Sequence, residues 1–531
     1  MKMEMKLNIN NCKKIRDILF FLIVFCVIFD YTTKFLWFNF WGLGGPYSAM
    51  LGDYPIMLGF LFTAVMVYKG YIHLWNKYVA FFFGLAFLVY EASAIHGLYI
   101  YPYWNLIINA ATPQIDKLPT TLIFLHKYNI NISYEKLFSI WIFIRSIKSI
   151  LLDLVYRFGF SYMIYLWYQN DFKRGWSIFT KGVLTGLAVF IVYGWIDVFY
   201  LHGSSTAAFI LMQINPVLHD IGKIHNWWPP LLWKGQFRSV FSEPSRVGNY
   251  IAFMLPFLFI PVINKLNHWK YYLVLIFCVS YMVFLTQART AVSMFIGIMG
   301  LTLVLVLFLC GKRDLKQLGM ILCTAGIAFI ISIATVMAFP ATEINPHKGG
   351  MNKAVVAYME SNVGSLASSN KRSNQARYAL IKSNFKIGLE HPLLGVSPML
   401  NGAYVVDHFD AFDLQSYEVR QWIAAYQKMG PLKHNFDAMN EYITVFATTG
   451  ILGLSCLLFP FAYGCIGLFL RIRKCADLSI KNKLCCLLIA TISSLVAGCN
   501  GSLILLYGIW ILLPLVYLAI TDKELWNEKP L

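Results

Sequence analysis

The sequence predicts an all-α polytopic membrane protein with about 12 transmembrane helices and a large, partly helical external loop between the late helices. Three observations predict this class. Of the 531 residues, 58% are hydrophobic and 13% are charged, and the mean hydropathy is +0.60; no soluble domain of this length has such a composition. The apolar residues form runs long enough to cross a bilayer. Lys and Arg gather in short loops between these runs, as the positive-inside rule expects.

The basic loops set the order and direction of the spans. The N-terminus carries Lys13, Lys14 and Arg16, and Arg471 opens the last basic loop, so both termini are expected in the cytoplasm. No cleavable signal peptide is evident, and the first span is expected to be a retained anchor. The predicted spans are residues 17–38, 55–68, 78–100, 147–168, 178–200, 247–263, 270–286, 291–309, 318–339, 441–470, 484–499 and 503–520, with external segments at 101–145 and 201–246.

Three parts of the chain follow from these spans. Residues 1–339 are predicted to form a bundle of helices 1–9, residues 340–440 a large external loop, and residues 441–531 helices 10–12. The fourth span contains two opposite charges, Asp153 and Arg157. Because they lie four residues apart, we expect them to form an ion pair along one helix face.

The net charge of +18 does not indicate a nucleic-acid partner, because the positive-inside rule already explains where the basic residues lie. The eleven cysteines lie in or beside the predicted spans or in basic loops. This arrangement argues against a disulfide framework and against a zinc site. No pair of acidic residues has the spacing of metal ligands, so we expect neither a metal nor another cofactor.

Residues 371–389 predict an amphipathic helix inside the large external loop. At ~100° per residue, Arg377 projects from the middle of its apolar face, where a guanidinium needs an anionic partner or water. Two interpretations are open: Arg377 reaches a carboxylate of the loop, or the helix lies over the bilayer and Arg377 points into a site for a phosphorylated lipid. The apolar face consists of Ala376, Tyr378, Leu380, Ile381, Phe385 and Ile387, and the basic face of Lys371, Arg372, Lys382 and Lys386.

Four arginines are predicted on or just below the outer surface, where the charge rule does not require them: Arg238, Arg246, Arg289 and Arg377. Arginine forks bind phosphate oxygens bidentately and stay charged. In a partly dehydrated pocket they would hold a diphosphate and stabilise the charge that develops on it as it leaves. Because the arginines come from distant parts of the chain, this hypothesis requires them to converge in the folded protein.

Four segments carry motifs that together resemble one known family. They are Phe237–Tyr250 (FRSVFSEPSRVGNY), Thr286–Ala291 (TQARTA), Arg377 with Ile381 and His391–Val396 (HPLLGV), and Asn440–Ile443 (NEYI) with Thr449–Leu454 (TGILGL). In this order, with a large outer loop between late helices, they resemble the bacterial O-antigen polymerase (Wzy-like) and O-antigen ligase superfamily. Its members are polytopic membrane glycosyltransferases that use polyprenyl-diphosphate-linked sugars. The resemblance covers about residues 235–455.

The resemblance implies that the loop 340–440 is periplasmic and that the protein works in the bacterial inner membrane. An undecaprenyl-diphosphate-linked oligosaccharide would donate its reducing end to the non-reducing sugar of another, with inversion at the anomeric carbon. Membrane lipid and a chain-length regulator are the other expected partners. The implied roles are diphosphate binding by Arg238, Arg246, Arg289 and Arg377, proton removal by His434 or Glu243, and glycan contact by Asn440 and Tyr442.

His434 is the preferred base because an unperturbed histidine has a pKa near ~6.5, although the arginines and substrate positioning could suffice without a strong base. The ligase branch of the family has a histidine eleven residues before the glycine that corresponds to Gly450, and this position is Met439. The departure favours a polymerase over an O-antigen ligase that transfers glycan to lipid A core. A flippase of lipid-linked oligosaccharides is the alternative from another class, but the long external loop does not suit a transporter.

Overall fold

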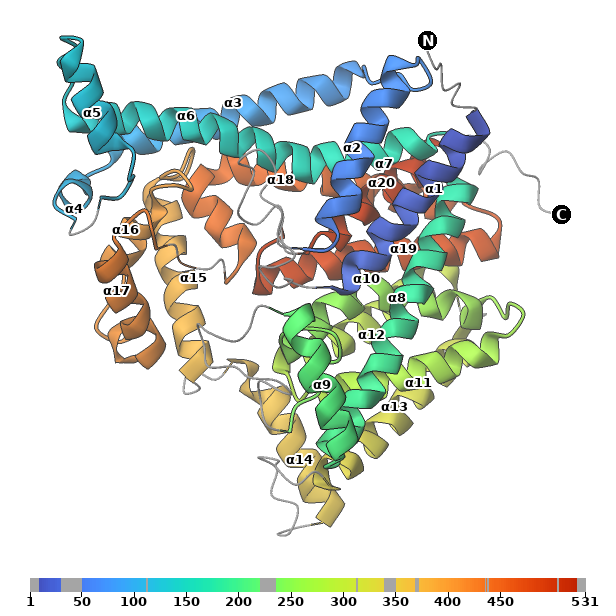
Figure 1. Ribbon diagram of the computed structural model, residues 1–531. Helices are drawn as coiled ribbons and strands as arrows, with labels where there is room; N and C mark the ends of the chain where they lie inside the picture. The colour runs from blue at the N-terminus through green and yellow to red at the C-terminus, as the bar shows by residue number, and fades with distance from the viewer. Residues whose placement is uncertain are drawn as a thin grey trace.

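The computed structural model describes residues 9–29, 50–110, 113–219, 235–311, 314–338, 350–367, 372–434, 436, 439–503 and 506–522. These residues form helices and no strand (Figure 1), which confirms the all-α class for them. The first helix is α1 (Ile9–Phe25), which continues into the 3-10 turn η1 (Cys26–Ile28). The predicted first span, 17–38, therefore starts inside α1 and runs on into residues outside the described part.

Seven of the described helices are long and apolar enough to cross a membrane, as expected for a polytopic membrane protein. Four further apolar helices are shorter, and the number 12 stays a prediction. The seven are α3 (Lys77–Ile100), α8 (Phe172–Leu201), α10 (Pro244–Ile263), α12 (Arg289–Cys310), α13 (Leu315–Ala338), α18 (Glu441–Lys474) and α19 (Leu478–Ala497). The shorter four are α2 (Asp53–Tyr68), α9 (Ser205–Leu218), α11 (Trp269–Leu285) and α20 (Gly508–Thr521).

The external segment predicted at 101–145 is more helical than its composition indicates. It contains α4 (Trp104–Ile108), α5 (Leu118–Lys127) and the first half of α6 (Tyr134–Leu154). α6 begins where Ser133 accepts a hydrogen bond from the backbone N–H of Lys136 (3.3 Å), a standard N-terminal cap. Pro102, Asn109 and Asn129 lie in the links between these helices, whereas Asn105 and Pro119 lie inside α4 and α5. In the same way, the external loop 201–246 contains α9.

The fourth predicted span is the second half of one longer helix. α6 passes through a π-helical turn, Val155–Gly159, into α7 (Phe160–Tyr168). The turn carries Arg157, whose Nε donates to Oδ1 of Asp153 (2.8 Å), as predicted from their spacing. Its Nη1 also donates to Oε1 of Glu441 (3.1 Å) at the start of α18. Because Arg157 and Glu441 are buried, this ion pair holds α6–α7 and α18 in register.

Replacement of Glu441 by glutamine is expected to lower the free energy of unfolding by about 1–2 kcal/mol, because the buried hydrogen bond to Arg157 loses its charge while the side-chain volume stays the same. The measurement is the thermal midpoint of the detergent-solubilised chain. Glu135→Gln, at an exposed position in the first turn of α6, is the matched control. Equal midpoints for the two variants would contradict a stabilising role of the ion pair.

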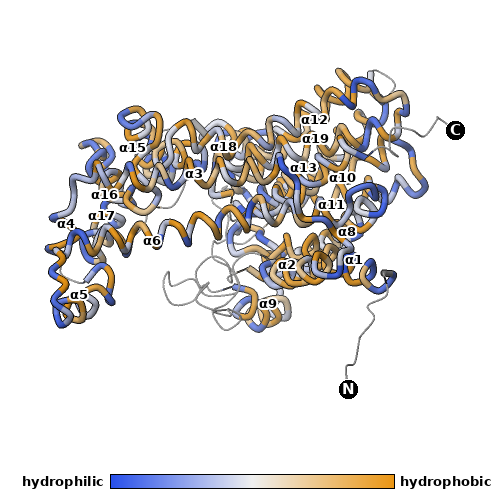
Figure 2. Tube along the Cα trace, turned by 90° about the horizontal axis from the view of Figure 1, so that it is seen from above, coloured by the Kyte–Doolittle hydropathy of each residue, from blue (hydrophilic) through white to orange (hydrophobic). Residues whose placement is uncertain are grey.

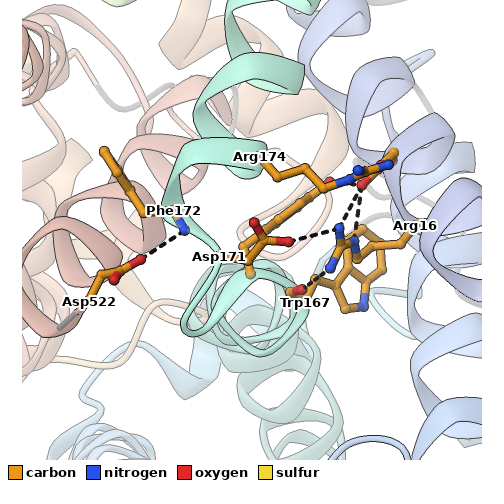
Figure 3. Close-up of polar contacts among 8 residues, drawn as sticks. Arg16, Trp167, Asp171, Phe172, Arg174 and Asp522 are labelled. Atoms are coloured by element: carbon orange, nitrogen blue, oxygen red, sulfur yellow. Dashed lines mark hydrogen bonds and ion pairs between the residues drawn. The ribbon is translucent and has the colours of Figure 1, made fainter. Parts of the chain in front are cut away.

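Polar contacts connect several of the segments that were predicted on the cytoplasmic side. Near α1, Arg16 Nη1 donates to the carbonyl of Trp167 (2.7 Å), and Arg174 pairs with Asp17 (Figure 3). The N–H of Phe172 donates to Asp522 (2.9 Å), just after α20. The N-terminal helix, the start of α8 and the end of α20 therefore lie at one end of the bundle.

A second group of contacts extends this end of the bundle. The side-chain amide of Asn264, just after α10, donates to the carbonyl of Ser479 (3.2 Å). Asn482 donates to the side chains of Asn264 (2.8 Å) and Asp314 (3.3 Å). The C-terminal end of α10, the segment before α13 and the first turns of α19 thus lie together. The N-termini of α10 and α12, where Glu243 and Arg289 lie, face the opposite end.

Helices also fill the part of the loop 340–440 that the structure describes. They are α14 (Gly350–Asn362), α15 (Arg372–Glu390), α16 (Asn401–Asp407) and α17 (Tyr417–Met429). In both Figure 1 and Figure 2, α15, α16 and α17 lie on the side of the molecule away from α1. Figure 2 shows apolar residues along much of α2 and α6, and polar residues at the tip of α5.

α15 confirms the helix predicted at 371–389 but corrects its apolar face. Ala376, Leu380 and Ile387 are buried, whereas Tyr378 and Phe385 are 45% and 48% exposed. The helix contacts both α17 and α18, so its buried surface is wider than a single stripe and follows the positions of its neighbours. Helical periodicity alone does not contain this information.

Two glycines join the loop to α18. Gly450 kinks α18 with a φ of 64°, and a Cβ at this position would lie 2.2 Å from the carbonyl carbon of Leu393. Gly395 has a φ of 65°, and its Cβ would lie 2.4 Å from the carbonyl carbon of Thr448. The backbone N–H of Ile451 donates to the carbonyl of Pro392 (2.8 Å). The motifs HPLLGV and TGILGL, far apart in sequence, are therefore two sides of one backbone contact, which we call the glycine clasp.

Candidate active site

The turn between α11 and α12 directs one arginine into a polar cluster. Gln287 has a φ of 49°, and the N–H of Ala288 is held by the hydroxyl of Thr286 (3.1 Å), so α12 begins at Arg289. The guanidinium Nη1 of Arg289 donates to Oδ1 of Asn374 (2.6 Å) on α15. This hydrogen bond connects two segments that are 85 residues apart in sequence.

A second arginine lies one helical turn after Asn374 on the same helix. Arg377 Nη1 donates to the side-chain oxygen of Asn500, which belongs to the 3-10 turn η10 (Gly498–Asn500) after α19. Asn500 Nδ2 in turn donates to the hydroxyl of Thr290 (3.1 Å), the residue after Arg289. The start of α12, the first turns of α15 and η10 thus form a closed ring, with two arginines and two asparagines.

The electrostatics of this ring favour an anion. Burial lowers the pKa of Arg377 and the nearby charge of Arg289 lowers it further, while Glu243 and Glu418 act in the opposite direction. The direct hydrogen-bond partner of Arg377 is a neutral amide, and no carboxylate of a described residue forms an ion pair with it. Two guanidiniums held close together in a partly dehydrated place have the charge and the donor geometry that suit an anion such as a phosphate.

A carboxylate lies at the edge of the same cluster. Glu243 precedes Pro244, the first residue of α10, and its side chain makes no capping hydrogen bond. Instead, its Oε2 accepts a hydrogen bond from the hydroxyl of Ser245 (3.2 Å), and its charge acts on Arg377. Arg289 and Arg377, both predicted for the site, therefore lie in one hydrogen-bonded ring, and the charge of Glu243, a third predicted residue, acts on Arg377.

Most of this cluster, with the whole glycine clasp, lies within residues 272–458, which match the family model described as O-antigen ligase. We call residues 272–458 the O-antigen ligase domain, after the family model that they match. The resemblance seen in the sequence is thereby confirmed, and members of this family are enzymes that act on lipid-linked glycans and membrane lipids. No curated protein and no solved structure matches the chain. Glu243 and Asn500 lie outside the matched residues and complete the site from both flanks of the domain.

Arg238 precedes the O-antigen ligase domain and lies in a different network. Its side chain is 1% exposed, and Asp197 of α8 accepts hydrogen bonds from the backbone N–H groups of Arg238 (3.1 Å) and Ser239 (2.7 Å). Burial lowers the pKa of Arg238, while Asp197, Tyr193 and Tyr200 act against this. The charged groups that act on the Arg238 guanidinium are thus different from those that act on Arg377. Arg246 lies at yet another place, in a cavity beside α10 and α19.

The other predicted residues of the O-antigen ligase domain have structural contacts. His434 follows α17, where its backbone N–H donates to the carbonyl of Gly430 (3.2 Å) and its ring packs on Phe436 at 5.2 Å. Asn440 caps α18 by accepting from the N–H of Ile443 (3.2 Å), and the hydroxyl of Tyr442 donates to the carbonyl of Leu495. The hydroxyl of Tyr442 also lies close to η10, since a Cβ on Gly498 would be 2.9 Å from it.

Sequence reasoning missed the two asparagines that orient the arginines. Asn374 lies in the predicted helix, only three residues before Arg377, but nothing in its local pattern separates it from the other polar residues. Asn500 had a clearer signal, because it is a polar residue in the short link between the last two predicted spans. A polar side chain at such a place in a membrane protein is a candidate functional residue.

Proposed function

We propose that the protein polymerises polyprenyl-diphosphate-linked oligosaccharide repeat units into O-antigen or a related surface polysaccharide at the periplasmic face of the inner membrane. The observation that carries the proposal is the ring in which Asn374 and Asn500 hold Arg289 and Arg377 side by side. A diphosphate has the charge and the oxygen geometry that two arginine forks bind. The lipid-linked donor would enter the site from the membrane, with its diphosphate on this arginine pair.

The proposed reaction is an inverting glycosyl transfer that needs no metal. The hydroxyl of the acceptor sugar attacks the anomeric carbon of the donor, the bond to the diphosphate oxygen breaks, and the diphosphate leaves with the electron pair. Arg289 and Arg377 stabilise the negative charge that develops on the leaving oxygen. Glu243 is the base that we favour to accept the hydroxyl proton, because its charge acts on Arg377.

Ligation of finished glycan to lipid A core is the second candidate, and the description of the matched family favours it. Against it stands Met439, at the position where the resemblance expects the ligase histidine. Met439 is partly buried and packs with the apolar cluster around Leu400 and Tyr404, and a methionine at this position offers no proton acceptor. This difference is the reason to prefer a polymerase.

The surface-glycan banding pattern of a deletion strain tests the proposal. A polymerase defect is expected to leave core capped with a single repeat unit, and the wild-type gene should restore the ladder of longer chains. Core without any repeat unit would instead indicate a ligase. Accumulation of lipid-linked repeats on the cytoplasmic leaflet would indicate a flippase and would contradict both transfer reactions.

A further inference from the structure

Three histidines lie beside the glycine clasp, and each comes from a different element. His96 lies in the last turns of α3, His391 begins the motif HPLLGV directly after α15, and His408 follows α16. The ring centroids of His96 and His391 lie 6.0 Å apart, and all three side chains are partly buried. The proposed glycosyl transfer uses none of them, so their presence at the clasp needs another explanation.

The end of α3 packs directly against the backbone of the clasp. The Nδ1 of His96 lies 2.8 Å from the carbonyl oxygen of Gly395; because a carbonyl only accepts, Nδ1 carries the hydrogen of this bond. A Cβ on Gly97 would lie 2.5 Å from the carbonyl oxygen of Val396. With so little room between helix and loop, a force that pushes His96 and His391 apart acts on the clasp itself.

The surroundings of His391 oppose a positive charge on its ring. Burial lowers the pKa of His391, and His96 and His408 lower it further, while Glu390 acts in the opposite direction. The ring of Tyr404 lies 5.9 Å from that of His391, and burial raises the pKa of Tyr404 to about 12, so it brings no charge. The closed clasp therefore binds fewer protons than an open one, and it should weaken as the pH falls below the ordinary histidine value of ~6.5.

The contacts of His408 strengthen this response to acid. Its Nδ1 lies 2.7 Å from the carbonyl oxygen of Tyr404, and its Nε2 lies 3.0 Å from a carboxylate oxygen of Glu390. Both partners are acceptors, so a doubly protonated ring satisfies them both. Acid thus adds a second cation near His391, and this cation pairs with Glu390, whose charge would otherwise offset a proton on His391.

We propose that His391, together with His96 and His408, forms an acid-sensitive switch that opens the glycine clasp when the His391 ring takes up a proton. The clasp fixes the C-terminal end of α15, and the first turns of the same helix carry Asn374 and Arg377 of the arginine ring. Acid therefore releases the helix that orients the arginine pair. The switch does not depend on whether the enzyme is a polymerase or a ligase.

Hydrogen exchange of the full-length protein in detergent, read by mass spectrometry, tests the switch. Two backbone N–H groups report the clasp directly, because Val396 donates to the carbonyl of Ala447 (3.1 Å) and Ile451 to that of Pro392 (2.8 Å). After correction for the intrinsic pH dependence of exchange, their peptides should lose protection about tenfold between about pH 7.5 and about pH 5, a usual size for coupling between a bound ligand and a conformational change. Peptides of α10 should keep their protection.

Three variants separate the switch from a general effect of acid. His391→Gln removes the titrating ring and should leave the protection of the clasp nearly equal at the two pH values. Glu390→Gln, at an exposed position, removes the opposing carboxylate and should enlarge the loss. His126→Gln, exposed on α5, is the matched control and should behave as the wild type.

The proposal is overturned if the wild type keeps its protection at about pH 5, or if His391→Gln loses as much protection as the wild type. Because Glu390 lies at the surface, its variant keeps the test decisive even when His391→Gln does not fold. A loss in Glu390→Gln that is equal to or smaller than in the wild type would also overturn the proposal.

Discussion

Replacement of Arg377 by alanine is expected to slow glycan transfer by about 10²–10³-fold, because it removes one guanidinium from the charge that develops on the leaving diphosphate. The loss should appear mainly in kcat, since the interaction is strongest in the transition state. The measurement is the rate of polymer formation from lipid-linked repeat units with the purified chain. In cells, the variant should accumulate lipid-linked single repeats on the outer leaflet.

Three comparison variants test the reason for this effect. Arg377→Lys keeps the charge without the two-pronged fork and should recover only part of the rate. Lys386→Ala removes an exposed positive charge from the same helix and should change little. Asn500→Asp places a carboxylate on Arg377, so it should compete with the diphosphate and slow transfer although both arginines remain. Wild-type rates in Arg377→Ala and Asn500→Asp would exclude this cluster as the diphosphate site.

Replacement of Gly450 by alanine is expected to destabilise the chain by about 3 kcal/mol, from the cost of a positive φ for a residue with a Cβ and from the collision with the loop. The new Cβ would lie 2.2 Å from the backbone of Leu393, which has no rotamer to change. The glycine clasp should then open, and the thermal midpoint of the solubilised protein should fall together with its yield in membranes.

Gly300→Ala is the matched control for the clasp. Gly300 lies in α12 with no atom within 4 Å of its added Cβ, so the substitution should leave the midpoint unchanged or slightly raised. A midpoint of Gly450→Ala equal to that of Gly300→Ala would contradict the idea that the positive φ and the close backbone approach hold loop and helix together. Gly395→Ala, on the other side of the contact, should repeat the loss.

Composition and local spacing were sufficient for the class of the protein and for most of its helices. Apolar runs separated by basic loops predicted α3, α8 and α10–α13 within a few residues, because the cost of leaving backbone groups unpaired in lipid makes such runs helical. The pair of Asp153 and Arg157 was predictable for a similar reason, since residues four apart on a helix are neighbours. The ion pair between Arg157 and Glu441 was not predictable, because these two residues lie 284 positions apart in sequence.

The membership of the candidate site was decided by tertiary packing. The four arginines have the same side-chain chemistry, and the hypothesis drawn from the sequence required all four to converge on one diphosphate. Asn374 and Asn500 orient Arg289 and Arg377, which lie 85 and 123 residues from these partners, whereas the turn at Arg238 is held by Asp197 in α8. The sequence by itself thus determined a helical membrane protein that resembles the O-antigen polymerase and ligase superfamily. Only the packing of α12, α15 and η10 decided which of the four arginines lie in one polar cluster, because helical periodicity describes neighbours along a helix and not contacts between helices.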